Sequence, residues 1–457
     1  MRTQAYYSGM LSIKNQQTTY TWQDVDATIK IIKGRTIPYD LYTYFYVYNL
    51  NDGTLASAAP LQQDPTTGRA VVGLFNYNLN YVTVSADTIR NQLSTCVHEF
   101  YHILAFNADL FPYFVDLNLN PVANTTLLAN YPTQIKGTTR KMFIGANVLQ
   151  FARNYLNNQS LPGVILESNG GDGSAGSHWA FMYWATEYMS PTDSSPSIFS
   201  NFSLAMALDT GWYTVNNSYV FDLEYGRGAG VDIQTDACPT SAIKGFCTTL
   251  DEVACGPDYK EKTTCSGDTT FSEGCLYRMA VVTCSFANVN YTTSQVDTTI
   301  ENLGDTSRCI MTSISGGSSV PRCAKSVCTG TTSITFNYAS SKTCTCNQNG
   351  GAATCSDNTY SATCPANITD FCTRLQSANK CPGDCSGQGI CMGPSGSKSC
   401  FCFYGWTGSD CTSSNPSETG SVITNSTSSS SSNSSSNRSF NILLKFCLIF
   451  TMAFIII

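Results

Sequence analysis

Histidine and charge are both scarce in this sequence. Its 457 residues include only three histidines, and charged residues make up 12%, about half the usual share of a soluble globular protein. The net charge is −7 at pH 7, which argues against nucleic acid or an anionic lipid surface as a partner, because both attract basic proteins. A chain of this length is too long for one hydrophobic core and predicts two or more domains.

Cysteine is almost absent from the first half of the chain. Cys96 is the only one before Cys238, whereas twenty of the 22 lie between Cys238 and Cys411. An even number in a Gly/Ser/Thr-rich region predicts disulfides formed in an oxidising compartment rather than zinc fingers, which need reduced thiols. Asn-X-Ser/Thr sequons agree with a secreted glycoprotein and occur at Asn124, Asn158, Asn201, Asn216, Asn290, Asn367, Asn425, Asn433 and Asn437.

The two ends of the chain give different indications. The start lacks the apolar segment of a signal peptide, so we expect that the true N-terminus is missing. Residues 412–439 are rich in Ser and Asn and predict a disordered stalk. The apolar tail 440–457 is interrupted by Lys445 and is shorter than the about 20 residues of a spanning helix. It is typical of a GPI-anchor signal, with a short membrane anchor as the alternative, and predicts a protein at the cell surface.

Residue patterns predict several regular elements. Aromatic and β-branched residues favour strands at 40–49 and 69–78. A helix is expected from the N-cap Ser85 to about Leu104, because apolar residues recur there at helical spacing. Two more helices are expected, at 141–157 and 201–210. From Cys238 onward the lack of periodicity predicts loops and short strands held by disulfides.

Two of the three histidines lie four residues apart, in the segment CVHEFYH. On a helix, His98 and His102 project from one face, so both imidazoles can reach one metal ion. Glu99 lies beside the first of them and can contact a water on that metal. This is the HExxH arrangement of zinc peptidases, in which the metal lowers the pKa of its water to about 7 and the glutamate is the general base.

The third zinc ligand is the open question. The position six residues after the second histidine is Ala108, which excludes the compact metzincin spacing. His178 is the one remaining imidazole, and a carboxylate from Glu167 or Glu187 is the alternative, as in thermolysin-like enzymes.

A resemblance to a known family bears on this choice. The segment LESNGGDGSAGSHWA, 166–180, resembles the surroundings of the third zinc histidine in leishmanolysin-like metallopeptidases, and FSLAMALDTGWYTV, 202–215, resembles a later segment of that family. The resemblance implies one Zn²⁺ per chain held by His98, His102 and His178, with Glu99 as the base and Met189 as the methionine of the Met-turn. It also implies an α+β fold: a metzincin-type catalytic domain of two subdomains around a zinc cleft, followed by a disulfide-rich, mostly loop and β region.

Two positions depart from the family pattern, and a third difference is that the family's propeptide with its inhibitory cysteine is absent. Ala105 stands where the family usually has glycine, so the turn after the helix is either strained or differently shaped if that site needs a positive φ. Val231 stands where the family tends to have cysteine, so at least one disulfide is missing or rearranged. Cys96 lies on the zinc helix and is interpreted as a small buried residue.

Residues 381–411 resemble an EGF-like module. The spacing of its cysteines and the Cys-x-Cys followed by Gly405, Trp406 and Gly408 carry this resemblance. The family pattern implies the pairs Cys381–Cys391, Cys385–Cys400 and Cys402–Cys411. The preceding residues lack acidic side chains, so no calcium is expected there.

The sequence therefore predicts a cell-surface zinc metalloendopeptidase that acts on protein or peptide substrates, attached to the membrane through its tail or a GPI anchor. A substrate is expected to pair with the 69–78 strand. The alternative function is a catalytically inactive surface adhesion or binding glycoprotein on the same fold. The predicted segments are 1–125 and 126–237 for the two catalytic subdomains, 238–380 for the Cys-rich domain, 381–411 for the EGF-like module, 412–439 for the stalk and 440–457 for the tail.

Overall fold

The computed structural model describes most of the chain. It covers Tyr7, 10–14, 20–21, 36–37, 40–49, 53–82, 86–192, 198–377, 380–392, 396–403 and 405–414. The expected N-cap Ser85, the stalk beyond 414 and the apolar tail lie outside these residues. Across the described ranges, every helix is too short or too polar to cross a bilayer.

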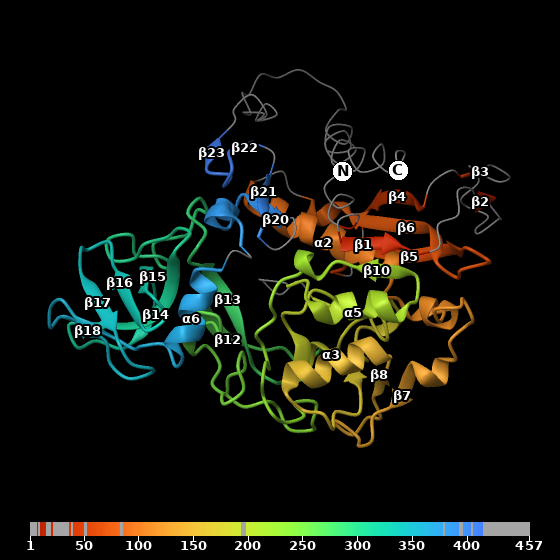
Figure 1. Ribbon diagram of the computed structural model, residues 1–457, viewed down its shortest axis with the longest axis horizontal. Coiled ribbons are helices and arrows are strands. Elements are labelled where there is room, and N and C mark those ends of the chain that lie inside the picture. The colour runs from red at the N-terminus through yellow and green to blue at the C-terminus, as the bar shows by residue number, and fades with distance from the viewer. Residues whose placement is uncertain are drawn as a thin grey trace.

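A three-stranded sheet forms the layer at the upper right of Figure 1. Its order is β4 (Tyr42–Tyr48), β6 (Ala70–Asn78), β5 (Ala56–Gln63). The central strand β6 runs parallel to β4 and antiparallel to β5. Both hydrogen-bonding edges of β6 are therefore occupied, so the expectation that a substrate adds to the 69–78 strand is wrong. The outer strands of this sheet are β4 and β5.

Helix α2 (Ala86–Leu104) packs on this sheet and carries the HExxH segment, close to the predicted bounds. The ring of Phe100 lies 5.5 Å from the ring of Phe75, centroid to centroid. A Cβ on Gly73 would lie 2.5 Å from Cγ2 of Ile103, so the glycine lets helix and strand approach closely. These contacts fix the helix, and with it the two histidines, against the sheet.

Helices α3 (Ala146–Leu156) and α5 (Asn201–Asp209) pack together below that layer. The bounds of α5 agree with the predicted helix at 201–210, but the helix predicted at 141–157 is wrong at its start. Lys141–Phe143 form strand β8 instead, paired with β7 and β9. Gly145 separates strand from helix, and a Cβ there would overlap the ring of Phe143 and the carboxylate of Asp209.

Shorter elements complete this part. Strand β1 (Leu11–Ile13) pairs antiparallel with β10 (Tyr213–Val215), which joins residues far apart in the sequence. The others are β2 (Tyr20–Thr21), β3 (Thr36–Ile37), β7 (Leu128–Asn130), β9 (Val164–Ile165), α4 (Phe181–Trp184) and the 3₁₀ helices Leu79–Tyr81, Ala108–Tyr113, Asn124–Thr126, Gly171–Gly173 and Asn217–Tyr219.

The Cys-rich region, at the left of Figure 1, is more regular than the loops and short strands expected. One sheet consists of β11 (Val253–Cys255), β12 (Glu261–Ser266) and β13 (Tyr277–Thr283). A second sheet consists of β14 (Ser307–Ile314), β15 (Val320–Thr329), β16 (Ser333–Asn337), β17 (Thr343–Cys346), β18 (Thr354–Cys355) and β19 (Tyr360–Ala362). A hydrogen bond from Ala353 N–H to the carbonyl of Ala362 brings β18 back to β19, so the second sheet closes on itself.

Helix α6 (Ile368–Leu375), which the sequence reasoning missed, packs Phe371 and Leu375 into the core of the closed sheet. The twenty cysteines between Cys238 and Cys411 are all paired, so Val231 leaves none of them without a partner. The pairs before the EGF-like module are Cys238–Cys275, Cys247–Cys265, Cys255–Cys309, Cys284–Cys323, Cys328–Cys372, Cys344–Cys355 and Cys346–Cys364.

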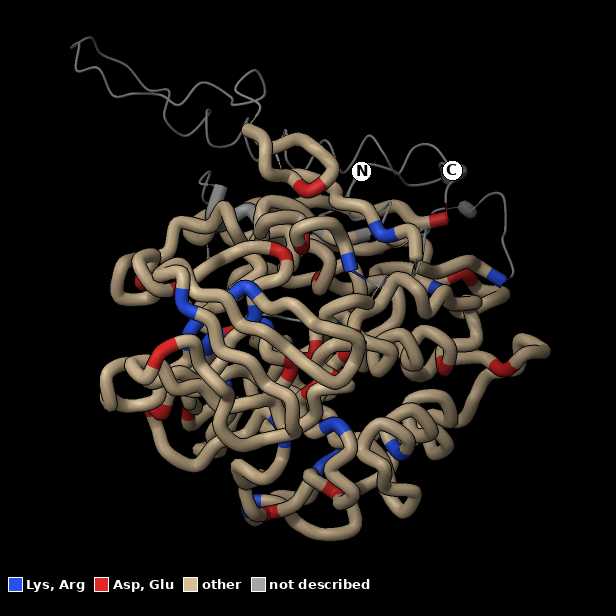
Figure 2. Tube along the Cα trace, turned by 60° about the vertical axis from the view of Figure 1, so that its left-hand side comes forward, with Lys and Arg blue, Asp and Glu red and all other residues tan. Residues whose placement is uncertain are grey.

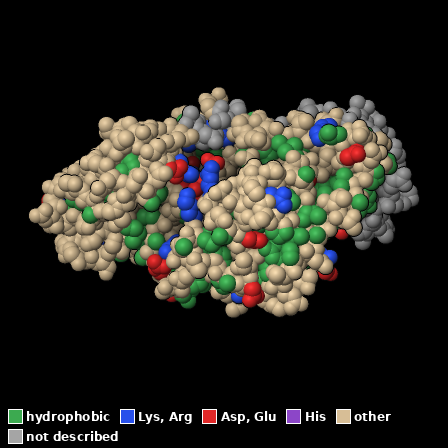
Figure 3. Space-filling view, turned by 60° about the horizontal axis from the view of Figure 1, so that its bottom comes forward, with side chains coloured by type: hydrophobic (Ala, Val, Ile, Leu, Met, Phe, Trp, Pro, Cys, Tyr) green, Lys and Arg blue, Asp and Glu red, His purple; other side chains and the backbone are tan. Residues whose placement is uncertain are grey.

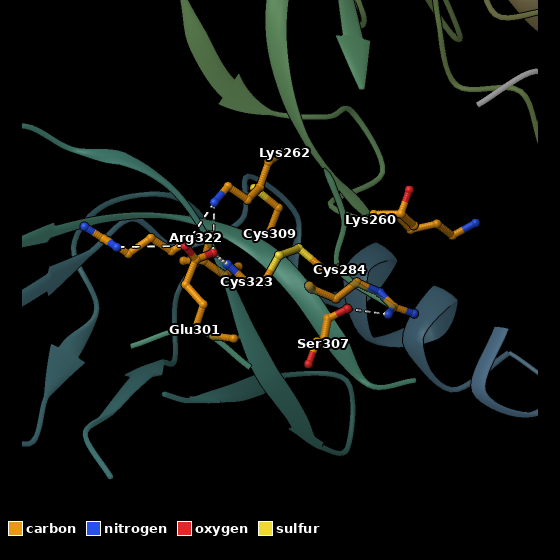
Figure 4. Close-up of a disulfide and its surroundings, with 12 residues drawn as sticks. Lys260, Lys262, Cys284, Glu301, Ser307, Cys309, Arg322 and Cys323 are labelled. Atoms are coloured by element: carbon orange, nitrogen blue, oxygen red, sulfur yellow. Dashed lines mark hydrogen bonds and ion pairs between the residues drawn. A yellow bond between two sulfur atoms is a disulfide. The ribbon is translucent and has the colours of Figure 1, made fainter. Parts of the chain in front are cut away.

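A buried carboxylate lies next to the Cys284–Cys323 disulfide (Figure 4). The side chain of Glu301 is 2% exposed; it accepts hydrogen bonds from the backbone N–H of Cys323 at 2.7 Å and from Nζ of Lys262 at 3.0 Å. One side chain thus connects strands of the two sheets of the Cys-rich region.

Replacing Glu301 with alanine is expected to lower the free energy of unfolding of the oxidised protein by about 3–5 kcal/mol, because the Lys262 ammonium then stays buried without its carboxylate. Denaturant titration measures this. Glu252→Ala is the matched control: Glu252 pairs with Arg278 at 3.0 Å but is 46% exposed, and an exposed pair contributes little. Equal losses in the two variants would contradict the assignment.

The EGF-like module is docked on the rest of the protein. It contains β20 (Gly389–Met392), β21 (Ser399–Cys402), β22 (Trp406–Thr407) and β23 (Ser413–Ser414). Its disulfides join Cys381 to Cys391, Cys385 to Cys400 and Cys402 to Cys411, the pairs that the resemblance implied. Nζ of Lys398 donates to the carbonyl of Ser218 at 2.6 Å and lies 4.8 Å from the ring centroid of Phe221. The module is therefore held against the residues that follow β10.

The Cys-rich region also meets the part of the chain before Cys238 through charge. Acidic and basic side chains gather in a hollow between the two (Figure 3). At this junction the buried carboxylate of Glu224 lies 2.6 Å from Arg374 of α6 and 2.6 Å from Arg227. These contacts join the two parts without a disulfide, since each disulfide lies between Cys238 and Cys411.

Candidate metal centre

The first two histidines extend from the last turns of α2. His98 and His102 are one helical turn apart, and their Nε2 atoms are 3.1 Å from each other. Their positions follow from the helix alone, because residues i and i+4 lie on the same face. Phe100 and Tyr101, between them in sequence, are buried and anchor the helix.

The third histidine reaches the same point from a distant segment. Nε2 of His178 lies 3.1 Å from Nε2 of His98 and 3.1 Å from Nε2 of His102. The loop before it is shaped by Glu167, whose carboxylate accepts hydrogen bonds from the backbone N–H groups of Ser168, Asn169 and Phe181. A hydrogen bond from Glu167 N–H to the carbonyl of His178 closes the loop at 2.9 Å.

The other ring nitrogen of each histidine has a carbonyl partner. Nδ1 of His98 lies 2.8 Å from the carbonyl of Tyr188, that of His102 lies 2.6 Å from Phe106, and that of His178 lies 2.9 Å from Ser174. A carbonyl can only accept, so each Nδ1 carries the proton and each Nε2 presents a lone pair.

Electrostatics keep these imidazoles neutral. Burial lowers the pKa of His98 to about 4 and that of His178 to about 3, and it lowers the pKa of His102 well below its ordinary value. Three neutral nitrogens with lone pairs directed at one another cannot hydrogen-bond and repel unless a cation lies between them. Tetrahedral zinc at about 2.0–2.1 Å would separate its nitrogen ligands by about 3.3 Å. The three histidines therefore fit a zinc ion.

The two glutamates considered as alternatives for the third ligand both have their carboxylates occupied by other hydrogen-bond donors. The carboxylate of Glu167 is occupied by three backbone N–H groups, as described above. That of Glu187 accepts from Met189 N–H at 2.7 Å and from the hydroxyls of Ser200 and Ser203, at 2.9 Å each. Among the described residues, neither glutamate belongs to the cluster formed by His98, His102 and His178.

Glu99 lies one residue after the first histidine, and 7% of it is exposed. Burial raises the pKa of its carboxyl to about 8, and a backbone hydrogen bond with Ala58 acts in the opposite direction. Ala58 belongs to β5, so this outer strand lies beside the carboxylate. This contact could not be predicted from the sequence, because every residue type except proline supplies a backbone N–H donor.

The departures from the family pattern can now be placed. Ala105 is buried and lies outside the positive-φ region, so it carries no strain of that kind. Its N–H and that of Phe106 both donate to the carbonyl of Tyr101, which ends the helix without a glycine. Cys96 is buried, as interpreted, and belongs to none of the ten disulfides. Met189 is fully buried, and its carbonyl accepts from the N–H of Trp179 at 3.0 Å, next to His178.

Comparison with known proteins agrees with this geometry. Residues 34–378 match the Peptidase_M8 family, described as leishmanolysin, and residues 381–414 match a Teneurin-like EGF domain. The first match extends through the Cys-rich region and the second covers the EGF-like module.

Several curated relatives are similar to part of the chain. A leishmanolysin-like peptidase of Drosophila melanogaster is 28% identical over 212 residues, 40% of this chain and 31% of that protein. A ciliated left-right organizer metallopeptidase of Xenopus laevis is 26% identical, over 48% of this chain and 31% of that protein. Leishmanolysin of Leishmania major is 24% identical, over 50% and 38%. The matched segments thus span about a third of the length of these relatives. The chain belongs to the leishmanolysin family, a family of zinc metallopeptidases.

Proposed function

We propose that the protein is a zinc-dependent metalloendopeptidase. One observation supports this most strongly: three Nε2 atoms lie 3.1 Å apart while every Nδ1 proton is committed to a backbone carbonyl. Only a cation makes that arrangement favourable. Family membership makes zinc the expected cation and peptide hydrolysis the expected reaction.

In this proposal His98, His102 and His178 hold one zinc ion. When bound, zinc polarises the scissile carbonyl and lowers the pKa of its water. Glu99 takes the proton of the attacking water and later gives it to the leaving amine. Met189 is proposed as the Met-turn residue beneath the histidines, in a contact that supports them without binding the metal.

The substrate is proposed to lie extended along the outer edge of β5. This strand contacts Glu99 through Ala58, and its inner edge pairs with β6. An added strand would place the scissile bond near the glutamate and the histidines. Residues 1–125 and 126–237 are proposed as two subdomains, with the substrate and the histidines in a cleft between them.

The setting is proposed to be extracellular. Ten disulfides need an oxidising compartment, and the sequons and the sequence of the tail agree with a glycosylated, anchored protein at the cell surface. In the view of Figure 2, Lys and Arg lie among Asp and Glu along the described chain, which argues against nucleic acid as a partner.

The purified chain is expected to cleave casein, and a zinc chelator such as 1,10-phenanthroline is expected to remove nearly all of this activity. Added Zn²⁺ should restore it. Hydrolysis that survives the chelator would contradict the proposal. A chain with one bound zinc and no hydrolysis of casein or a peptide library would favour the alternative, an inactive adhesion or binding protein on the same fold.

A further inference from the structure

The turn 187–190 touches both histidine-bearing segments, α2 and the segment around His178. The carbonyl of Tyr188 accepts the Nδ1 proton of His98 at 2.8 Å, and the hydroxyl of Tyr188 donates to the carbonyl of Ser94 on the same helix. On the other side, the carbonyl of Met189 accepts from the N–H of Trp179. A shift of this turn would therefore move α2 and the His178 segment relative to each other.

One carboxylate holds this turn. Glu187 is 1% exposed, and all its hydrogen-bond donors in the described residues are neutral. One oxygen accepts from Met189 N–H and from the hydroxyl of Ser203; the other accepts from the hydroxyl of Ser200. Burying an anion without a cation is costly, so such a group is expected to have a specific role.

The same network reaches the neighbours of two histidines through Ser203. Its hydroxyl accepts from Nε1 of Trp179 at 3.2 Å while donating to Glu187, and its carbonyl accepts from the hydroxyl of Tyr101. Trp179 follows His178 and Tyr101 precedes His102. Helix α5 therefore joins the zinc helix and the third-ligand segment through one serine whose hydroxyl is oriented by Glu187.

We propose that Glu187 is a positioning residue for the metal centre: through Met189 N–H and Ser203 it holds the three histidines at one point. This inference rests on the proposed zinc site and adds the group that sets its geometry. Removing a group that orients metal ligands typically weakens metal binding about 10–100-fold.

The experiment measures zinc affinity of the full-length chain by competition with a chelator, and the absorption spectrum of the cobalt-substituted protein. Glu187→Ala is expected to weaken zinc binding at least about tenfold and to alter the cobalt spectrum. Glu187→Gln keeps one acceptor oxygen for Met189 N–H, so an intermediate affinity is expected. If the Glu187→Ala variant does not fold, the zinc affinity and cobalt spectrum of the Glu187→Gln variant test the inference.

Asp209→Ala is the matched control. Asp209 is also a carboxylate that accepts backbone N–H groups, from Asn147 and Val148 at 2.9 Å each, but it caps α3 and contacts no histidine. The Asp209→Ala variant is expected to have a lower melting temperature, with zinc affinity and the cobalt spectrum unchanged. The inference is overturned if the Glu187 variants bind zinc like the parent, or if Asp209→Ala weakens binding as much. Failure of the proposed function would differ, because the parent itself would then bind no zinc or hydrolyse nothing.

Discussion

Replacing His178 with alanine is expected to remove zinc from the protein and to abolish hydrolysis. The variant keeps His98 and His102 on α2 but loses the nitrogen that lies 3.1 Å from both. Two neutral imidazoles bind zinc far more weakly than three. Zinc affinity is therefore expected to fall more than about 100-fold, further than when a group that only orients a ligand is removed. Metal content per chain after dialysis measures this directly.

Ser174→Ala is the control for the loop that carries His178. Nδ1 of His178 donates to the backbone carbonyl of Ser174 at 2.9 Å, which the substitution keeps; only the hydroxyl, 3.4 Å from the same nitrogen, is removed. We expect this variant to retain about one zinc per chain. If His178→Ala also retains one tightly bound zinc, the three-histidine site is wrong and another group must complete it.

Replacing Glu99 with alanine is expected to separate the two effects: zinc stays bound and hydrolysis is lost. Glu99 is not part of the histidine cluster, so the metal keeps its ligands. Removal of a general base typically costs about 10²–10⁴-fold in rate. The measurements are kcat and KM on a peptide substrate, with zinc content on the same sample. KM is expected to change little, because binding along β5 does not need the carboxylate.

Stability gives a second readout for Glu99. Burial raises the pKa of this carboxyl to about 8, so the ionised form is disfavoured by folding. The alanine variant is therefore expected to unfold at a temperature no lower than the parent, as at other sites where function opposes stability. Asn91→Ala, an exposed change on the same helix, should alter neither rate nor zinc. A Glu99→Ala protein that cleaves at the parental rate would remove Glu99 from the mechanism.

The sequence predicted the parts of the site that depend on local pattern. Helical spacing and the pair His98 and His102 were enough to place α2, and the segment around His178 was placed through its resemblance to the family. The helix at 201–210 was also correct. In each case the signal lies in residue types within one continuous stretch of chain.

Other parts could not be predicted because they depend on backbone groups or on distant pairing. The carbonyls of Tyr188, Phe106 and Ser174 orient the histidines, yet any residue type supplies a carbonyl. Strand β8 was mistaken for helix because its apolar residues suit both structures, and pairing with β7 decides between them. The closed sheet of the Cys-rich region and seven of its disulfides join residues whose partners the spacing of cysteines leaves undetermined.

The pairing of β1 with β10 has a consequence for biosynthesis. Residues 11–13 find their partners only when 213–215 have left the ribosome, and the three imidazoles come together only after His178 has been made. These contacts therefore form only once about half of the chain has been made, and contacts so distant in sequence form slowly. The cystines, in contrast, are 9 to 54 residues apart and follow afterwards. Because the first cysteine of these pairs is Cys238, disulfide formation begins on a chain in which all three histidines have already been made.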